Sequence, residues 1–474
     1  MRISLVFKNA SYLFTSNVLI RLINSLATIL VARYLGAYDF GVLNIALAFA
    51  FIASFFTDMG LSNTVMREAT KPNANISELV SSYLKVRCIF ALLTLVVFIF
   101  VINVLYNDPY LINFVCWLVI PTIFGSALQN IGSIYFQAIQ EMKYTALIRG
   151  VSGLITSSTL ILFIILKLPF SWLAPIYGIS SILGGIFSIF IVTRRVYIFN
   201  GWNKAILNNL ANFTIGGIAV IILPQLGPII LEKSTNLKEV GYFAAAYKIP
   251  SVLYSIPGVI AAAFYPLLFK YGNNKEFSKH EKLSIIQLKF MSALGIIMAL
   301  PFLVYPEFWV RLLFGENWLP TSPALSILSL MVILQSINYP LADALTTKGR
   351  QFYRTVVMIA GVFLGSILYF ILGRQWGSVG GACAAVLIEV VLLIGFTSLN
   401  FNSGRKILEL GTKYNLFSAF LTYAISYFFL KWVHPFIGIS ISMISFIMFV
   451  SMMDHELRKK TINYFKILSK KSFY

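Results

Sequence analysis

Charged residues are scarce in this chain of 474 residues. Asp, Glu, Lys and Arg together make up 11% of it, whereas a soluble domain carries about a quarter. So few charges cannot cover the surface of a soluble protein of this length. The charged residues are also mostly positive, with 37 Lys and Arg against 17 Asp and Glu. A net charge of +20 would suggest nucleic acid in a soluble protein, but its distribution along the chain has another explanation, and no nucleic-acid partner is expected.

Cysteine and histidine, the residues of many metal and active sites, are also rare. Cys88, Cys116 and Cys383 are scattered, without a C-x-x-C pair, so neither a disulfide framework nor a metal site is indicated. The three histidines fall in predicted loops or at the ends of predicted spans. No Walker loop, G-x-S-x-G or H-E-x-x-H motif occurs. We therefore expect no metal, no cofactor and no enzymatic activity.

Long apolar runs are what the sequence has in abundance, since 58% of its residues are hydrophobic. A bilayer core about 30 Å thick needs roughly 20 apolar residues as a helix. In lipid only helices or closed barrels satisfy the backbone, and these runs are too long and too uniformly apolar for barrel strands. The sequence therefore predicts an all-α integral membrane protein with fourteen transmembrane helices. They cover residues 9–32, 40–62, 81–104, 110–136, 144–166, 172–193, 206–231, 238–264, 285–304, 323–346, 354–372, 378–399, 413–431 and 435–453.

The first apolar run extends beyond a signal-peptide core, so we interpret it as the first span and expect no cleavable signal peptide. Lys and Arg divide unequally between alternate connections. Of the 37, 28 fall on one side and seven on the other, and Arg21 and Lys248 lie deep within spans. The positive-inside rule places the richer side in the cytoplasm. Both termini are then expected in the cytoplasm, which requires an even number of spans.

Two stretches of the chain are weakly similar. Asp39-Phe40-Gly41 lies at the start of a long span, and Glu239-Val240-Gly241 lies at the start of another, six spans later. Both would enter the membrane in the same orientation, which predicts a parallel repeat of two six-helix lobes with a central cavity. The expected domains are an N-terminal lobe at 1–204, a C-terminal lobe at 205–400, and two further helices with a basic cytoplasmic tail at 401–474. The tail from residue 454 is interpreted as an interfacial helix or as a disordered basic segment.

Ionisable residues within spans are expensive and normally face a cavity or a partner. Arg21, Lys248 and Glu389 lie deepest in the predicted spans. Closer to the cytoplasmic face are Arg87, Arg149, Asp58 and Asp343. Deep basic groups suggest an anionic substrate, because guanidinium and ammonium groups bind phosphate oxygens. The acidic groups are interpreted as sites for a coupling ion or as counter-charges, and the four near the face as interface anchors or interhelical pairs.

Two prolines interrupt the seventh predicted span. Pro224 and Pro228 remove helix hydrogen bonds and favour a bend. We interpret this segment as a hinge for alternating access, with a static kink as the alternative.

These residues resemble a known family, the polysaccharide transporters of the multidrug/oligosaccharidyl-lipid/polysaccharide exporter superfamily. Ala32–Gly36 with Asp39–Gly41 is similar to the end of their first span. Thr57–Ser62, followed by Arg67-Glu68, resembles their D-x-G-L and R-E segment, and Glu239–Pro250 resembles their V-G-x-Y-x-x-A-Y-K-I-P opening of the eighth span.

The resemblance implies a flippase for O-antigen or exopolysaccharide repeat units. Such proteins move an undecaprenyl-diphosphate-linked oligosaccharide from the cytoplasmic to the periplasmic leaflet of the bacterial inner membrane. The family's cationic cavity would correspond to Arg21 and Lys248, with Arg87 and Arg149. The implied partners are the lipid-linked oligosaccharide, membrane lipids, and polymerase and chain-length proteins of the same pathway.

Two other functions remain open at this stage. A cation-coupled multidrug exporter of similar fold would use Asp58, Asp343 or Glu389. A polysaccharide polymerase or ligase would also be polytopic, but such enzymes usually display a large outer loop. The longest outer connection expected here runs only from Tyr305 to Ser322, which disfavours that class.

Overall fold

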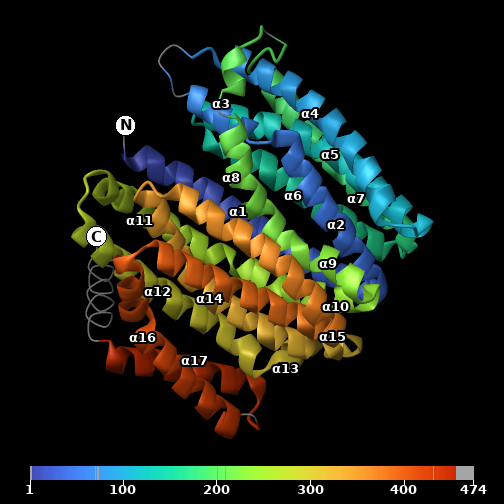
Figure 1. The fold of residues 1–474 in the computed structure, drawn as a ribbon. Coiled ribbons are helices and arrows are strands. Elements are labelled where there is room, and N and C mark those ends of the chain that lie inside the picture. The colour runs from blue at the N-terminus through green and yellow to red at the C-terminus, as the bar shows by residue number, and fades with distance from the viewer. Residues whose placement is uncertain are drawn as a thin grey trace, which may run out of the picture. The chain divides into compact units, whose positions relative to one another are not determined.

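The computed structural model describes residues 3–69, 71, 74–199, 201–208, 210–430 and 432–454, with side chains from residue 18 onward apart from isolated positions. Within these ranges every regular element is helical and no strand occurs (Figure 1). The prediction of an all-α fold is confirmed. Beyond Asp454, the predicted interfacial tail lies outside the described residues.

The helices of the first half are α1 (Ile3–Leu35), α2 (Ala37–Asp58), α3 (Leu61–Ala69), α4 (Ile76–Leu105), α5 (Pro109–Ala138), α6 (Met142–Ile165), α7 (Leu173–Thr193), α8 (Leu210–Ile222) and α9 (Leu226–Ser234). The second half contributes α10 (Leu237–Leu253), α11 (Ser255–Asn273), α12 (Phe277–Val304), α13 (Pro306–Leu313), α14 (Ser322–Thr347), α15 (Gln351–Leu399), α16 (Asn402–Ile425) and α17 (Pro435–Met453). Short 3₁₀ segments lie at Phe170–Trp172, Lys204–Leu207, Leu223–Gln225 and Glu316–Thr321, and a π turn at Ser426–Leu430 follows α16.

The chain is a multi-pass membrane protein. Among the described residues, eleven helices are long and apolar enough to cross a membrane, or twelve if the bent pair α10 and α11 forms one span. The difference from fourteen arises in two places. Helix α15 has 49 residues, roughly 74 Å at about 1.5 Å each, and non-helical backbone at Trp376 and Gly377 interrupts it. Helix α16 carries several charges in its first half. Counting α15 as two spans and α16 as one would give fourteen, which stays a prediction.

Several helix ends follow directly from local sequence. Asn75 precedes α4, and its side-chain oxygen accepts a hydrogen bond from the backbone N–H of Glu78 at 3.3 Å. Asp108 caps α5 in the same way through Tyr110 N–H at 3.0 Å, and Pro109 occupies the first helical position. A proline there loses no helix hydrogen bond, because that N–H has no partner inside the helix. The predicted break between the spans 81–104 and 110–136 is confirmed.

The second predicted span, 40–62, is wrong at its end. Helix α2 stops at Asp58 because Met59 (φ 42°) and Gly60 (φ 82°) have left-handed backbone. A Cβ at Gly60 would lie 2.6 Å from the Cβ of Phe213 in α8, so a glycine fits both the conformation and the space. Leu61–Ala69 then forms the separate helix α3, and Asp58 is placed at a helix end rather than inside a span.

The predicted spans 206–231 and 238–264 are each interrupted. The first is divided into α8 and α9 by the 3₁₀ segment Leu223–Gln225, which contains Pro224. Pro228 lies in the first turn of α9. The second is divided where α10 ends at Leu253 and α11 begins at Ser255. The breaks follow the proline pattern of the sequence, because a ring without an N–H cannot continue the helix ladder.

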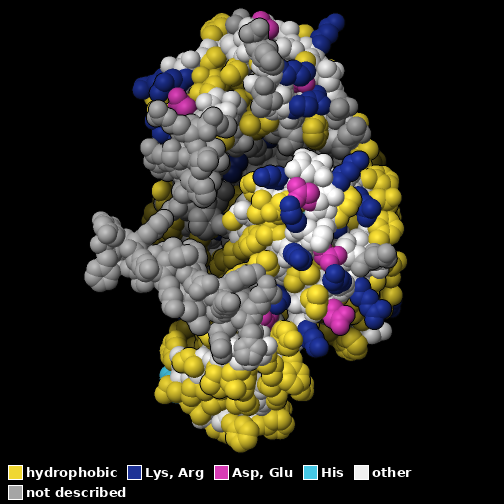
Figure 2. All heavy atoms as spheres, turned by 90° about the vertical axis from the view of Figure 1, so that its left-hand side faces the viewer, with side chains coloured by type: hydrophobic (Ala, Val, Ile, Leu, Met, Phe, Trp, Pro, Cys, Tyr) yellow, Lys and Arg dark blue, Asp and Glu magenta, His cyan; other side chains and the backbone are white. Residues whose placement is uncertain are grey.

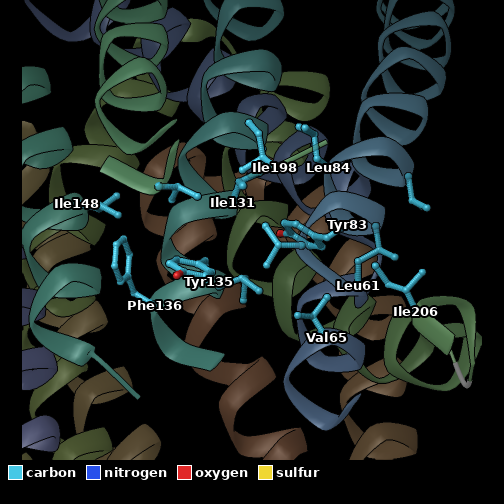
Figure 3. Close-up of a cluster of buried hydrophobic side chains, with 14 residues drawn as sticks. Leu61, Val65, Tyr83, Leu84, Ile131, Tyr135, Phe136, Ile148, Ile198 and Ile206 are labelled. Atoms are coloured by element: carbon cyan, nitrogen blue, oxygen red, sulfur yellow. The ribbon is translucent and has the colours of Figure 1, made fainter. Parts of the chain in front are cut away.

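By internal packing the described residues fall into two compact units, Met1–Ala245 with Gly365–Ser378 and Ala246–Leu364 with Val379–Tyr474. In the first unit, a cluster of buried side chains joins α3, α4, α5 and α6. Figure 3 shows Tyr83 of α4 beside Leu61 of α3, with Ile131 and Tyr135 of α5 nearby. The second unit has a smaller cluster between α12 and α17, around Ile296, Leu300, Phe446 and Val450. The predicted lobe boundaries remain predictions, since these units are defined by contacts alone.

Large apolar side chains cover much of the described surface. Phe100, Phe363 and Phe428 are about 70% exposed (69%, 70% and 70%). Figure 2 shows hydrophobic side chains over wide areas of the described surface and Lys and Arg side chains in number on the face it presents. Exposed apolar area of this extent is stable against lipid tails and would aggregate in water.

The two glycines of the sequence repeat meet within the first unit. A Cβ added at Gly41 of α2 would fall on the carbonyl oxygen of Leu237, and a Cβ added at Gly241 of α10 would fall on that of Ala37. Each matched stretch therefore presents its glycine to the beginning of the other helix. The backbones approach so closely that no side chain fits between them, as in other small-residue contacts of membrane helices.

We expect Gly41→Ala and Gly241→Ala each to lower the free energy of unfolding by about 1–3 kcal/mol, the usual cost of overpacking. The measurement is the thermal unfolding midpoint of the purified protein in detergent. Gly150→Ala in α6 is the matched control, because nothing lies within 4 Å of the position of its Cβ and alanine favours a helix. Unchanged midpoints for both repeat glycines would contradict the close contact.

Candidate functional site

Arg87 and Asp58 form a buried ion pair in the first unit. Arg87 of α4 is 1% exposed, and its Nη1 lies 2.6 Å from Oδ1 of Asp58 at the end of α2. Its Nη2 donates to Oγ1 of Thr57 at 3.1 Å. The Asp58 carboxylate also accepts from the hydroxyls of Ser62 at 2.6 Å and Tyr83 at 2.9 Å. The geometry agrees with the interhelical pairing that the sequence left open, and a substrate contact by Arg87 stays a prediction.

Arg21 and Arg149 lie on the neighbouring helices α1 and α6. Ile20 lies against Gly153, and Ser157 donates a hydrogen bond to the side chain of Asn24. These two contacts run in parallel register, so Arg149 lies about one helical turn before the level of Arg21. Arg21 is exposed and Arg149 is half-buried, and neither guanidinium has an ion pair or hydrogen bond with the described residues. The structure thus leaves two cationic groups available on adjacent helices.

Lys248 of α10 is half-buried in the second unit. Its backbone carbonyl accepts from Ser251 Oγ at 2.7 Å. For its ammonium group the described part of the chain provides neither a carboxylate within 4 Å nor a hydrogen-bond acceptor. A lysine in a membrane span without a counter-charge is costly, so an anionic ligand would stabilise it.

Glu389 of α15 is buried against two amide side chains of α14. It is 6% exposed, and its carboxylate accepts from Asn338 Nδ2 at 2.7 Å and from Gln335 Nε2 at 3.0 Å. The amide oxygens Gln335 Oε1 and Asn338 Oδ1 are buried and have no donor among the described residues. Tyr247 of α10 lies close enough to interact with the Glu389 charge. Among the described residues no Lys or Arg pairs with this carboxylate.

Asp343, five residues after Asn338 in α14, has a similar setting. It is 1% exposed and accepts from Gln287 Nε2 of α12 at 3.0 Å. Gln287 Oε1 is buried, and the part of the chain that the structure describes supplies no donor to it. Tyr265 and Arg354 lie within electrostatic range. Glu389 and Asp343 therefore both accept hydrogen bonds from neutral amide side chains, in contrast to Asp58.

The amides that hold these acids were not predicted from the sequence, and neither was the buried pair of Lys289 and Asp454. Gln335, Asn338 and Gln287 are neutral and were not among the ionisable residues of the spans. Their spacing could have indicated them, since Gln335 and Asn338 lie three residues apart and so share a face of α14. Lys289 is buried in α12 and paired with Asp454 at 2.8 Å.

The predicted hinge residues lie where the helix is broken. Pro224 is in the 3₁₀ segment between α8 and α9, and Pro228 is near the beginning of α9. The break is observed, whereas its use as a hinge stays a prediction. Among the described residues, no group of three or more His, Cys, Asp or Glu is arranged to hold a metal ion.

Comparison with known proteins gives the family. The model of a family described as "Polysaccharide biosynthesis protein" matches residues 6–272, more than half of the chain. The chain belongs to this family. The resemblance to polysaccharide exporters that the sequence motifs predicted is thereby confirmed.

Relatives of this family member carry related names. A protein of Shigella flexneri named as an O-antigen transporter is 22% identical over 391 residues, which cover 76% of this chain and 90% of that protein. The lipopolysaccharide biosynthesis protein WzxC of Escherichia coli K12 is 23% identical over 178 residues, covering 35% of this chain and 34% of WzxC.

Solved structures share the fold of this family member. The lipid II flippase MurJ in an inward closed conformation has a TM-score of 0.71 at 17% identity, over 94% of this chain and 99% of MurJ. An inward-facing multidrug transporter of the MATE family has a TM-score of 0.68 at 13% identity, over 84% and 99%. At these identities the likeness is one of fold.

Proposed function

We propose that this protein is a flippase that moves an undecaprenyl-diphosphate-linked oligosaccharide, an O-antigen or exopolysaccharide repeat unit, from the cytoplasmic to the periplasmic leaflet. The observation that carries the proposal is Lys248, a cationic group within the membrane that has no counter-charge in the described structure. Family membership and the O-antigen transporter among its relatives support it. The protein would act by transport, without covalent chemistry.

The diphosphate is the part of such a substrate that most needs protein contacts. It carries negative charge that is expensive to place in lipid, whereas the polyprenyl chain is stable there. Lys248 provides a mobile point charge, and Arg21 and Arg149 provide forked donors that match phosphate oxygens. In this proposal alternating access uses the broken segment around Pro224 and Pro228 as its hinge. Polymerase and chain-length proteins of the same pathway would take up the product.

The buried acid Glu389 suggests how transport is driven. A buried carboxylate without a cationic partner is costly, and a bound proton or small cation removes that cost. The orphaned oxygens of Gln335 and Asn338 could contribute to either state after rotation of the amides. We therefore propose that Glu389 holds a coupling proton or sodium ion, with Asp343 as a second candidate.

The test of the proposed function is transport by the purified protein in liposomes. Fluorescently labelled undecaprenyl-diphosphate oligosaccharide is added, and its movement between leaflets is followed with a quencher that cannot cross the membrane. The expected result is flipping that requires the protein and the diphosphate. Failure with several repeat-unit sugars, at confirmed insertion of the protein, would contradict the proposal.

A cation-coupled multidrug exporter is the second candidate. It is favoured by the carboxylates of Glu389 and Asp343, which accept hydrogen bonds from amide side chains and suit cationic substrates. The fold shared with a multidrug transporter also favours it. A drug-susceptibility assay separates the two functions, because a flippase for lipid-linked sugars should confer no resistance to cationic drugs.

We expect Glu389→Gln to keep the protein folded but to abolish the stimulation of transport by a proton or sodium gradient. Glutamine has the shape of a protonated glutamate, so it can accept from Asn338 and donate to a free amide oxygen. The measurement is liposome transport with and without each gradient, beside the thermal unfolding midpoint. Glu316→Gln, at an exposed position, is the matched control. Full stimulation in Glu389→Gln would rule out Glu389 as the coupling group.

A further inference from the structure

A basic cavity lies in the second unit, and its wall contains none of the residues assigned to the substrate. Its volume is about 600 Å³ and it is open to the outside. The polar residues of its wall are Ser278 and Glu281 of α12, Lys348 and Arg350 between α14 and α15, Asn400 after α15, and Ser403 and Lys406 of α16. Phe277 and Phe401 complete the rim and are both 54% exposed.

Two of the three cations in this cavity have no carboxylate within 4 Å among the described residues. Lys406 is paired with Glu281 at 2.6 Å. Lys348 donates to the neutral hydroxyl of Ser403, at 2.9 Å. The guanidinium of Arg350 stacks on the ring of Phe401, 4.7 Å from its centroid. Burial, and then the charge of Arg350, lower the pKa of Lys348, while the charge of Glu281 acts in the opposite direction.

Three helices begin at this cavity. Its wall contains Phe277, the first residue of α12, together with Arg350 and Phe401, which directly precede α15 and α16. The beginning of a helix carries free N–H groups and a partial positive charge. The partial positive charges of these three helix ends add to the charges of Lys348 and Arg350. The electric field in the cavity therefore favours an anion with several oxygen acceptors.

Gly349 explains why Lys348 and Arg350 lie so close together. It has φ 74° and nothing within 4 Å of the position of its Cβ. The glycine is needed for its backbone conformation rather than for space. The tight turn between α14 and α15 places Lys348 and Arg350 on one wall.

Asn400 joins two helices at the wall of the cavity. It is 2% exposed, and its Nδ2 donates to the carbonyls of Leu341 in α14 at 2.9 Å and Phe396 in α15 at 3.0 Å. These hydrogen bonds hold the end of α15 against α14.

The location of the cavity indicates that the anion is the phosphate of a lipid. The turns at 274–276, 348–350 and 400–401 all belong to the side that the charge distribution assigns to the cytoplasm. Exposed rings such as Phe277 and Phe401 are typical of the boundary between headgroups and acyl chains. Basic pockets between transmembrane helices on that side bind phosphate-bearing headgroups.

We propose that this cavity binds the phosphodiester of an anionic phospholipid of the cytoplasmic leaflet. The phosphate contacts Lys348, Arg350 and the helix N–H groups. The bound lipid joins the beginnings of α12, α15 and α16. The wall of the cavity contains none of Arg21, Lys248 and Glu389, and so the site can stand whether or not the proposed transport function does.

The test is native mass spectrometry of the full-length protein titrated with phosphatidylglycerol or phosphatidylcholine. We expect retention of phosphatidylglycerol at least tenfold stronger than that of phosphatidylcholine. One cation near an anionic headgroup contributes about a factor of five in affinity. The variant Lys348→Gln/Arg350→Gln should therefore bind phosphatidylglycerol about 25-fold more weakly, and each single variant about fivefold more weakly.

The control variant is Lys270→Gln/Lys413→Gln, which removes the same charge at two exposed positions outside the cavity. It should bind within twofold of the wild type. Equal weakening by both double variants would show a general charge effect and overturn the site, as would unchanged binding in Lys348→Gln/Arg350→Gln. The single variants decide the question if the double variant fails to fold.

A competition with glycerol phosphate identifies the source of the phosphate. At millimolar concentration it should displace little phosphatidylglycerol, because it lacks the acyl chains that lie in the bilayer. Binding of glycerol phosphate without binding of phosphatidylglycerol would overturn the lipid assignment and make the cavity a site for a soluble anion.

Discussion

Lys248→Ala is expected to reduce liposome transport of the lipid-linked oligosaccharide by about 10- to 150-fold. A hydrogen bond to a charged group is worth about 1.5–3 kcal/mol, and the ammonium of Lys248 has no carboxylate of the described chain to retain it. Arg21→Ala should lose a similar factor, and the double variant should fall to background. Stability should change little, since neither side chain is held by a protein partner among the described residues.

Two controls accompany this prediction. Lys238→Ala removes a charge from the same helix at an exposed position near its beginning and should transport normally. Lys248→Arg keeps the charge and should recover part of the activity. Normal transport by both Lys248→Ala and Arg21→Ala, at normal protein levels, would refute the assignment of these residues to the diphosphate.

Asp58→Ala is expected to destabilise the protein by about 3–5 kcal/mol, because it leaves the guanidinium of Arg87 buried and unpaired. The folded protein should then be recovered at much lower yield and with a lower thermal unfolding midpoint. Removal of both charges in Asp58→Leu/Arg87→Met should restore much of the loss, since a buried ion pair is often replaceable by apolar side chains.

An exposed ion pair provides the comparison for that experiment. Arg311 and Glu316 lie 2.9 Å apart, at 58% and 66% exposure, and Glu316→Ala should cost at most about 1 kcal/mol. The rescued variant also tests the predicted role of Arg87 in binding. Normal transport by Asp58→Leu/Arg87→Met would show that Arg87 serves the fold and does not contact the substrate.

Composition and apolar runs were sufficient to predict an all-helical, multi-pass protein, because lipid leaves the backbone almost no other choice. Helix ends were predictable where a local signal exists, as at Asp108 and Pro109. The end of α2 was not, because the left-handed backbone at Met59 and Gly60 depends on packing against Phe213, 153 positions further along the chain.

The candidate site was predictable to the same degree. Asp58, Arg87 and Glu389 stand out in a sequence, because a charge in a membrane span is rare. Their partners do not, since no sequence rule pairs Asp58 with Arg87 or selects Gln335 and Asn338 as donors to Glu389. These pairings depend on how helices pack, and packing is a property of the whole chain.

The contact between Gly41 and Gly241 also constrains how the protein folds while it is being synthesised. The two glycines are 200 positions apart, and a ribosome adds about 5–20 residues per second. Helix α2 must therefore wait roughly 10–40 seconds in the membrane before α10 is made. During that time the beginning of α2 has no backbone partner from α10. The early helices must be stable enough to persist without the contact that later joins them to the second half of the chain.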